Sequence, residues 1–108
     1  MPGREYYNSG GYAASGTISN DGGSLLQITG FNPTANAGFL LLFDVAAPPA
    51  LTVPVQSIAV PALGNFSWCP TPPGRPFSPA MSWAVSSTGD EYTVSADAWW
   101  VYAELQGQ

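Results

Sequence analysis

The stretch Phe39-Leu40-Leu41-Leu42-Phe43 is the longest run of large apolar residues in this chain. Successive side chains of an extended strand point to opposite faces, so this run places apolar groups on both faces. Such a strand requires cover on both sides, either from a second sheet and a loop or from another subunit. We therefore expect residues 39–43 to form the central strand of a β-sheet.

Other runs with β-strand character lie on both sides of this stretch, separated by turn residues. Residues 12–19 and 25–32 flank Asn20-Asp21-Gly22-Gly23, whose Asp-Gly pair favours a hairpin turn, so we expect these two runs to pair. Further strands are expected at residues 55–60, 63–69, 77–87 and 91–105. The pattern predicts an all-β fold, a single antiparallel β-sandwich that is jelly-roll-like and has about eight strands.

The length and the charge limit the classes of function. The 108 residues suffice for one domain, which we place at residues 12–108 behind a polar, Gly-rich N-terminal arm at residues 1–11. Lysine and histidine are absent and the net charge is −5, so no basic patch for nucleic acid is expected and an anionic membrane is an unfavourable partner. No apolar run approaches the roughly 20 residues that span a bilayer, and the N-terminus lacks the apolar core of a secretory signal.

Catalytic and metal-binding chemistry find little support in the residue types. Without histidine, a nucleophilic triad has no base. Asp44 and Asp97 are the carboxylate pair to inspect for glycosidase chemistry, although each is better interpreted as a strand-end or turn residue. We expect no catalytic residue, no metal ligand and no cofactor.

Two smaller features have plain structural interpretations. Asn20, Asp21, Asp90 and Glu91 offer oxygen ligands for calcium, but their spacing matches no calcium loop, which favours solvated turn residues. Cys69 is the only cysteine, which excludes an intrachain disulfide. We expect it to be a small buried hydrophobic residue beside Trp68.

The end of the chain contains more apolar surface than one face of a strand can bury. From Trp99 to Tyr102 large apolar groups fall on both faces, and a contiguous exposed patch of this size usually marks an interface. We assign the core to residues 39–43 and Trp83. The interface with another subunit or partner protein is assigned to Tyr6, Tyr7, Trp99, Trp100, Val101 and Tyr102.

The aromatic residues also permit a second interpretation. Four tryptophans and five tyrosines could provide stacking platforms for sugar rings, with Trp68 and Trp99 as the candidates for glycan stacking. In the alternative, which we favour, Trp83 and Trp100 fill the core while Trp68 and Trp99 seal contacts between subunits.

Several motifs resemble those of small virion proteins of tailed bacteriophages. They are Ile28-Thr29-Gly30-Phe31-Asn32, Phe39-Leu40-Leu41-Leu42-Phe43-Asp44, Val53-Pro54-Val55, Gly74-Arg75-Pro76-Phe77 and Trp83-Ala84-Val85-Ser86-Ser87-Thr88. The resemblance covers residues 24–100 and implies a compact decoration, cement or fibre-like protein, often trimeric, attached outside a capsid or tail. The insert at residues 69–73 and the doubled Trp99-Trp100 depart from the pattern, which leaves the attachment site open.

Together these observations lead to one expected function and one alternative. We expect a non-enzymatic bacteriophage structural protein, a capsid decoration or cement protein that assembles as a homotrimer on the particle surface and binds the major capsid protein or another virion protein. Its location would be the virion, assembled in the host bacterial cytoplasm. The alternative is a carbohydrate-binding or adhesion module of a head or tail fibre.

Overall fold

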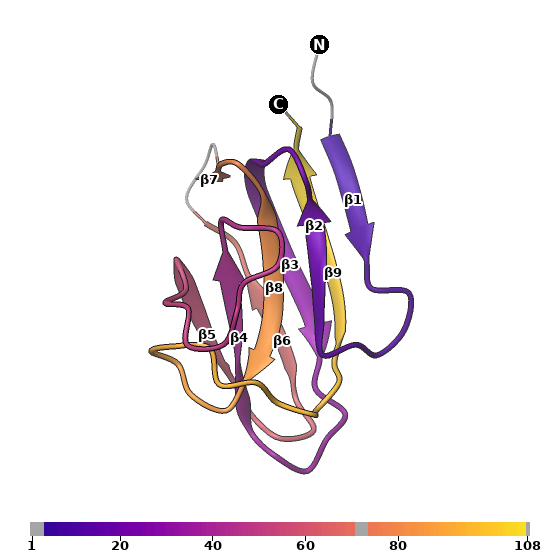
Figure 1. Cartoon of the computed structure of the whole chain (residues 1–108). Coiled ribbons are helices and arrows are strands. Elements are labelled where there is room, and N and C mark those ends of the chain that lie inside the picture. Colours follow the sequence, from indigo (N-terminus) through magenta and orange to yellow (C-terminus); the bar gives the residue numbers. More distant parts are fainter. Residues whose placement is uncertain (1–3, 71–73, 108) are drawn as a thin grey trace.

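The computed structural model describes residues 4–70 and 74–107, which form two antiparallel sheets packed face to face (Figure 1). The five-stranded sheet contains β1 (Arg4–Asn8), β9 (Trp100–Gln106), β3 (Gly23–Phe31), β6 (Asn65–Trp68) and β7 (Arg75–Phe77). The four-stranded sheet contains β2 (Ser15–Ser19), β8 (Met81–Ser86), β4 (Gly38–Phe43) and β5 (Gln56–Val60). The prediction of a single all-β sandwich is confirmed.

The strand pairs are nested. β1 pairs with β9, β2 with β8, β3 with β6 and β4 with β5, as in one long antiparallel ribbon. Two further pairs, β9 with β3 and β8 with β4, arise where the ribbon rolls up, so that its first strand pair lies beside its third and its second beside its fourth. The resulting orders, β1-β9-β3-β6 and β2-β8-β4-β5, are those of a jelly roll. The short strand β7, which pairs with β3, brings the total among the described residues to nine.

β4 occupies the central position that its sequence predicts, between β8 and β5. Leu40 and Leu42 belong to the main core between the sheets, whereas Leu41 and Phe43 belong to a second cluster on the outer face. Tyr92, from the segment that follows β8, packs on this outer cluster. Of the two kinds of cover considered for this strand, a second sheet and a loop of the same chain provide it.

A partly buried hydrogen bond ties β1 to the opposite sheet. The indole Nε1 of Trp83 donates to the hydroxyl of Tyr7 over 3.0 Å. Gly16 lies beside this pair, and a Cβ built there would lie 2.8 Å from Trp83 Nε1 and collide with the Tyr7 hydroxyl. The expected N-terminal arm is therefore wrong for residues 4–8, because they form a strand of this sandwich whose tyrosine reaches the core.

Three other sequence expectations differ from the structure. The strands on either side of Asn20-Asp21-Gly22-Gly23 do not pair with each other, because β2 lies in one sheet and β3 in the other. The last strand begins at Trp100 rather than Glu91, since the segment after Glu91 first packs Tyr92 on the outer face of the four-stranded sheet. The run at residues 77–87 is divided into β7 and β8, with Pro79 between them.

Two expectations fall partly on residues outside the described ranges. The arm at residues 1–11 includes residues 1–3, and the departure from the family pattern at residues 69–73 includes residues 71–73. Cys69 itself is described, and it is exposed rather than buried. The described residues contain no helix long and apolar enough to span a bilayer.

Replacing Tyr7 by phenylalanine is expected to lower the free energy of unfolding by about 1–2 kcal/mol, because it leaves the buried Nε1 of Trp83 without an acceptor. The matched control is Tyr6→Phe, since Tyr6 is the neighbouring residue of β1 and is 61% exposed. Urea unfolding followed by circular dichroism measures both variants. Equal stability of the two would contradict the role assigned to the Tyr7 hydroxyl.

Candidate functional site

An aromatic row crosses the outer face of the five-stranded sheet. It contains Tyr6 from β1, Tyr102 and Trp100 from β9, and Phe31 from β3, and we call these four residues the aromatic face. Asn8, two residues after Tyr6, pairs with Tyr102, and Phe31 pairs with Trp100. Because paired residues share a face of a sheet, the register brings side chains from three neighbouring strands together.

Three rings of the aromatic face lie close to one another, with one pair tilted and one pair stacked. The centroids of Tyr6 and Tyr102 are 6.4 Å apart with their planes at 33°, and those of Trp100 and Tyr102 are 6.5 Å apart at 28°. Tyr6 is 61% exposed, and the other three are half-buried. The row therefore presents partly exposed aromatic rings on regular sheet structure.

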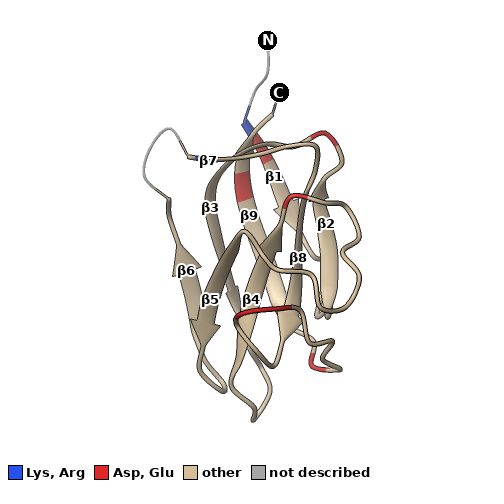
Figure 2. Ribbon diagram, turned by 60° about the vertical axis from the view of Figure 1, so that its left-hand side comes forward, with Lys and Arg blue, Asp and Glu red and all other residues tan. Residues whose placement is uncertain are grey.

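Neutral polar residues and one ion pair border the aromatic face. Thr29 pairs with Tyr102, and Gln27 pairs with Glu104 on the same face of the sheet. The guanidinium of Arg4 lies 3.8 Å from the Glu104 carboxylate, so this part of the surface carries no net charge. Figure 2 shows that charged residues are few and dispersed over the described chain.

Three residues expected at an interface point into the core instead. Trp99 and Val101 are both 0% exposed, and the Trp99 ring packs against Phe66 at a centroid distance of 6.0 Å. The alternation of side chains along β9 sends Val101 inward and Trp100 and Tyr102 outward. Tyr7 also faces inward, toward Trp83. The assignment of Tyr7, Trp99 and Val101 to an interface is therefore wrong, while that of Tyr6, Trp100 and Tyr102 stays a prediction.

The two tryptophans singled out for glycan stacking do not form one surface. Trp99 is buried and cannot stack on a ligand, so that assignment is wrong. Trp99 fills the core in place of Trp100. Side chains alternate along this part of the chain, and Trp99 lies on the inner face together with Val101, whereas Trp100 lies on the outer face. Trp68 is half-buried and packs against the main core from β6, where it pairs with Ile28.

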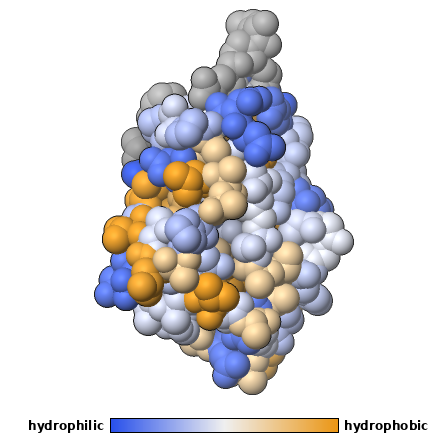
Figure 3. All heavy atoms as spheres, in the orientation of Figure 1, coloured by the Kyte–Doolittle hydropathy of each residue, from blue (hydrophilic) through white to orange (hydrophobic). Residues whose placement is uncertain are grey.

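Exposed aliphatic residues lie on the loops that cover the four-stranded sheet. Figure 3 shows hydrophobic residues concentrated on the β4 and β5 side of this face. Exposed residues of these loops are Val45, Leu51, Val53 and Val94, which we call the aliphatic patch. Sequence reasoning missed this patch because its members are separated along the chain and each is flanked by polar, alanine or proline residues.

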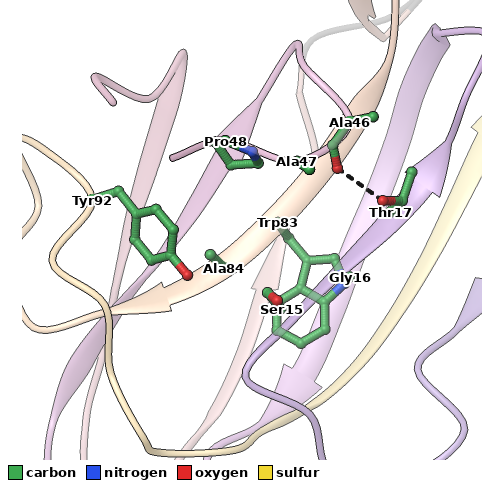
Figure 4. A pocket seen from close by; sticks show the side chains of 9 residues that line it. All are labelled: Ser15, Gly16, Thr17, Ala46, Ala47, Pro48, Trp83, Ala84 and Tyr92. Atoms are coloured by element: carbon green, nitrogen blue, oxygen red, sulfur yellow. Dashed lines mark hydrogen bonds between the residues drawn. The ribbon is translucent and has the colours of Figure 1, made fainter. Parts of the chain in front are cut away.

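A small pocket lies beneath the same loops (Figure 4), with a volume of about 210 Å³. Residues 46–48 lie across from Gly16 and Thr17, and the Thr17 hydroxyl donates to the Ala46 carbonyl at 2.9 Å. The Tyr92 ring points toward the pocket from another side. Its lining contains hydroxyl groups but no carboxylate or basic group, and it is smaller than the roughly 300–1,000 Å³ typical of ligand pockets.

The candidate glycosidase carboxylates lie far apart. Asp44 directly follows β4, whereas Asp97 lies two residues before Trp99, whose ring is next to Gly38 at the start of β4. Six residues of strand span roughly 17 Å between their first and last Cα atoms. Glycosidase carboxyl groups are separated by about 5–9.5 Å, and placement near opposite ends of β4 does not favour such a pair.

The turns considered for calcium are also separated. Asn20 follows Ser19, which pairs with the first residue of β8, whereas Asp90 lies beyond the last residue of that strand. Among residues 4–70 and 74–107, no three His, Cys, Asp or Glu side chains are grouped to hold a metal ion.

Comparisons with protein-family models, with curated proteins and with solved structures find no match to this chain. A function for the chain must therefore be inferred from the surfaces of the sandwich.

The inward and outward assignments along β9 can be tested by a pair of substitutions. Trp99→Ala is expected to cost about 3–5 kcal/mol of unfolding free energy, because it opens a cavity in the core. Trp100→Ala is expected to cost less than about 2 kcal/mol, because the ring is already partly in water. Guanidinium unfolding with a common m value measures the difference, and a larger loss for Trp100→Ala would reverse the assignment.

Proposed function

We propose that this chain is a non-enzymatic structural protein of a bacteriophage particle, a decoration or cement protein that binds a neighbouring virion protein through the aliphatic patch. The mechanism is burial of apolar surface in many repeated copies. Each contact contributes modestly, and repetition over a particle makes the attachment persistent. The proposed location is the particle surface, after assembly in the bacterial cytoplasm.

The aliphatic patch is the observation that carries this proposal. Leu51 is 64% exposed and Val53 is 71% exposed. Exposed aliphatic side chains on neighbouring loops favour a contact with another protein, because such a contact removes them from water. Unlike aromatic or amide side chains, aliphatic ones offer a ligand only burial, which suits a protein surface of similar composition.

The loops that carry the patch are held in place by hydrogen bonds. The Leu51 amide donates to the Tyr92 carbonyl at 2.7 Å, and the Tyr92 amide donates to the Thr52 carbonyl at 2.9 Å. Leu51 adopts a φ of 71°, a left-handed conformation that costs a leucine of order 1 kcal/mol. Its large apolar side chain is exposed to solvent, which is unfavourable for the isolated chain and favourable once a partner covers it.

Two further observations support the assignment to a particle. The sequence motifs between Ile28 and Thr88 resemble those of virion proteins, and jelly rolls are common among viral capsid domains, which is support by analogy of fold. The proposed homotrimer is supported by the resemblance alone. Binding to the major capsid protein or another virion protein is proposed on the same basis.

Leu51→Asp and Leu63→Asp form a matched pair that tests the attachment surface. Both leucines are about two-thirds exposed, 64% and 65%, and both have positive φ, which aspartate tolerates. Leu63 lies outside the patch, in the turn between β5 and β6. Burial of a leucine is worth about 1.5–3 kcal/mol, so Leu51→Asp is expected to weaken attachment by about 10-fold or more, and Leu63→Asp to leave it unchanged.

The measurement uses particles of the phage that encodes the chain, with its gene deleted and the purified protein added back. Wild-type protein is expected to sediment with the particles and to raise the temperature at which they rupture. Mass photometry of the free protein reports its oligomeric state. A micromolar monomer that neither sediments with particles nor protects them would overturn the proposal, as would equal binding of the two aspartate variants.

A further inference from the structure

We infer that the aromatic face binds an uncharged glycan, with its sugar rings stacked on Tyr6, Tyr102 and Trp100. This activity goes beyond attachment to a particle and uses the opposite side of the sandwich. The aromatic face lies on the outer side of the five-stranded sheet, whereas the aliphatic patch lies on loops over the four-stranded sheet.

The shape of the aromatic face fits a chain of sugar rings. The Tyr6 and Tyr102 rings are tilted, with centroids 6.4 Å apart, and the Trp100 and Tyr102 rings are stacked, with centroids 6.5 Å apart, so the row offers a series of neighbouring rings rather than one pocket. The apolar faces of sugar rings, which carry C–H groups, stack on aromatic rings in this way. Because the rings belong to regular strands and pack against one another, little conformational freedom is lost when a ligand binds.

The residues beside the row supply the hydrogen bonds that a sugar requires. Asn8 and Thr29 each pair with Tyr102, on the two neighbouring strands, and Gln27 lies two residues before Thr29. An amide group both donates and accepts, and a threonine hydroxyl does the same. This combination matches the many hydroxyl groups of a glycan better than it matches an aliphatic protein surface.

The charge of the protein favours a glycan over single-stranded nucleic acid, the other polymer that stacks on rows of aromatic rings. Single-stranded nucleic acids bind where aromatic rings are combined with a positively charged groove. The net charge here is −5, and Arg4, which borders this face, is paired with Glu104. A phosphate backbone would be repelled, whereas an uncharged polysaccharide is not affected by the net charge.

The experiment is a glycan array of neutral and acidic glycans, followed by titration of the best neutral ligand with tryptophan fluorescence and calorimetry. Trp100 is the tryptophan within the row, so a bound sugar is expected to change the emission of the wild-type protein and not that of Trp100→Phe. Affinity is expected to be the same at low and high salt, because no ion pair contributes.

Tyr6→Ala is the main variant, because Tyr6 is exposed and its loss is compatible with folding. It is expected to weaken glycan binding about 10-fold. Leu63→Ala, at a residue of similar exposure outside the row, is the control and is expected to bind like wild type. Circular dichroism confirms that both variants are folded.

Three outcomes would overturn the inference. The first is no binding to any neutral glycan at millimolar concentration. The second is binding only to acidic polymers, or with an affinity that falls steeply with salt. The third is a change of oligomeric state in Tyr6→Ala without glycan binding by the wild-type protein, which would show that a second copy of the chain covers the aromatic face. None of these outcomes depends on attachment to a particle.

Discussion

The two-sided burial of β4 is the constraint on which the rest of this structure depends. Leu40 and Leu42 face the opposing sheet, while Leu41 and Phe43 face outward and must also leave water. A single sandwich buries only the inner faces of its sheets, so the chain uses its own loops to cover the second face. Tyr92 supplies the central contact of that cover. The loops in turn carry the aliphatic patch, so the same requirement that shapes the core also creates an exposed apolar surface.

In the five-stranded sheet, buried and partly exposed residues alternate along the central strand β9, so the outer face of this sheet differs from that of the four-stranded sheet. Along β9 the buried residues Val101, Ala103 and Leu105 alternate with Trp100, Tyr102 and Glu104, so one face enters the core and the other needs no cover. An uncovered sheet face can present a regular row of side chains. Continuous hydrophobicity in one sheet and alternation in the other therefore give the two sides of the sandwich different chemistry, aliphatic on one and aromatic with neutral polar groups on the other.

The sequence was sufficient for the fold class, the central strand and the core position of Trp83, because these follow from local patterns of side chains. The sequence was insufficient wherever the residues that contact each other lie far apart along the chain. The Asp-Gly turn after β2 suggested a hairpin, but in a jelly roll consecutive strands cross between sheets and pair with strands far along the chain. For Trp99-Trp100, the alternation of side chains along a strand shows that the two tryptophans face opposite sides of the sheet. It does not show which of the two faces the core. That choice depends on the register of β9 with β3, where Val101 lies opposite buried Gly30. Three of the four residues of the aromatic face, Tyr6, Trp100 and Tyr102, were named from the sequence, but for a subunit or capsid interface rather than for glycan stacking. Phe31 was missed as an ordinary strand residue.

The strand β1 connects the stability of the sandwich with the surface proposed to bind glycan. Its alternation sends Tyr7 to the buried indole of Trp83 and Tyr6 to the aromatic row, so one edge strand contributes to both. Within the described chain β1 pairs with β9 alone, so a single ladder of backbone hydrogen bonds holds it in the sheet. Detachment of β1 would remove the exposed ring of the row and also uncover Trp83. The hydrogen bond between Tyr7 and Trp83 opposes that detachment from inside the core, and in doing so it keeps the Tyr6 ring beside that of Tyr102. The geometry of the outer face is thus maintained by a contact that no ligand touches.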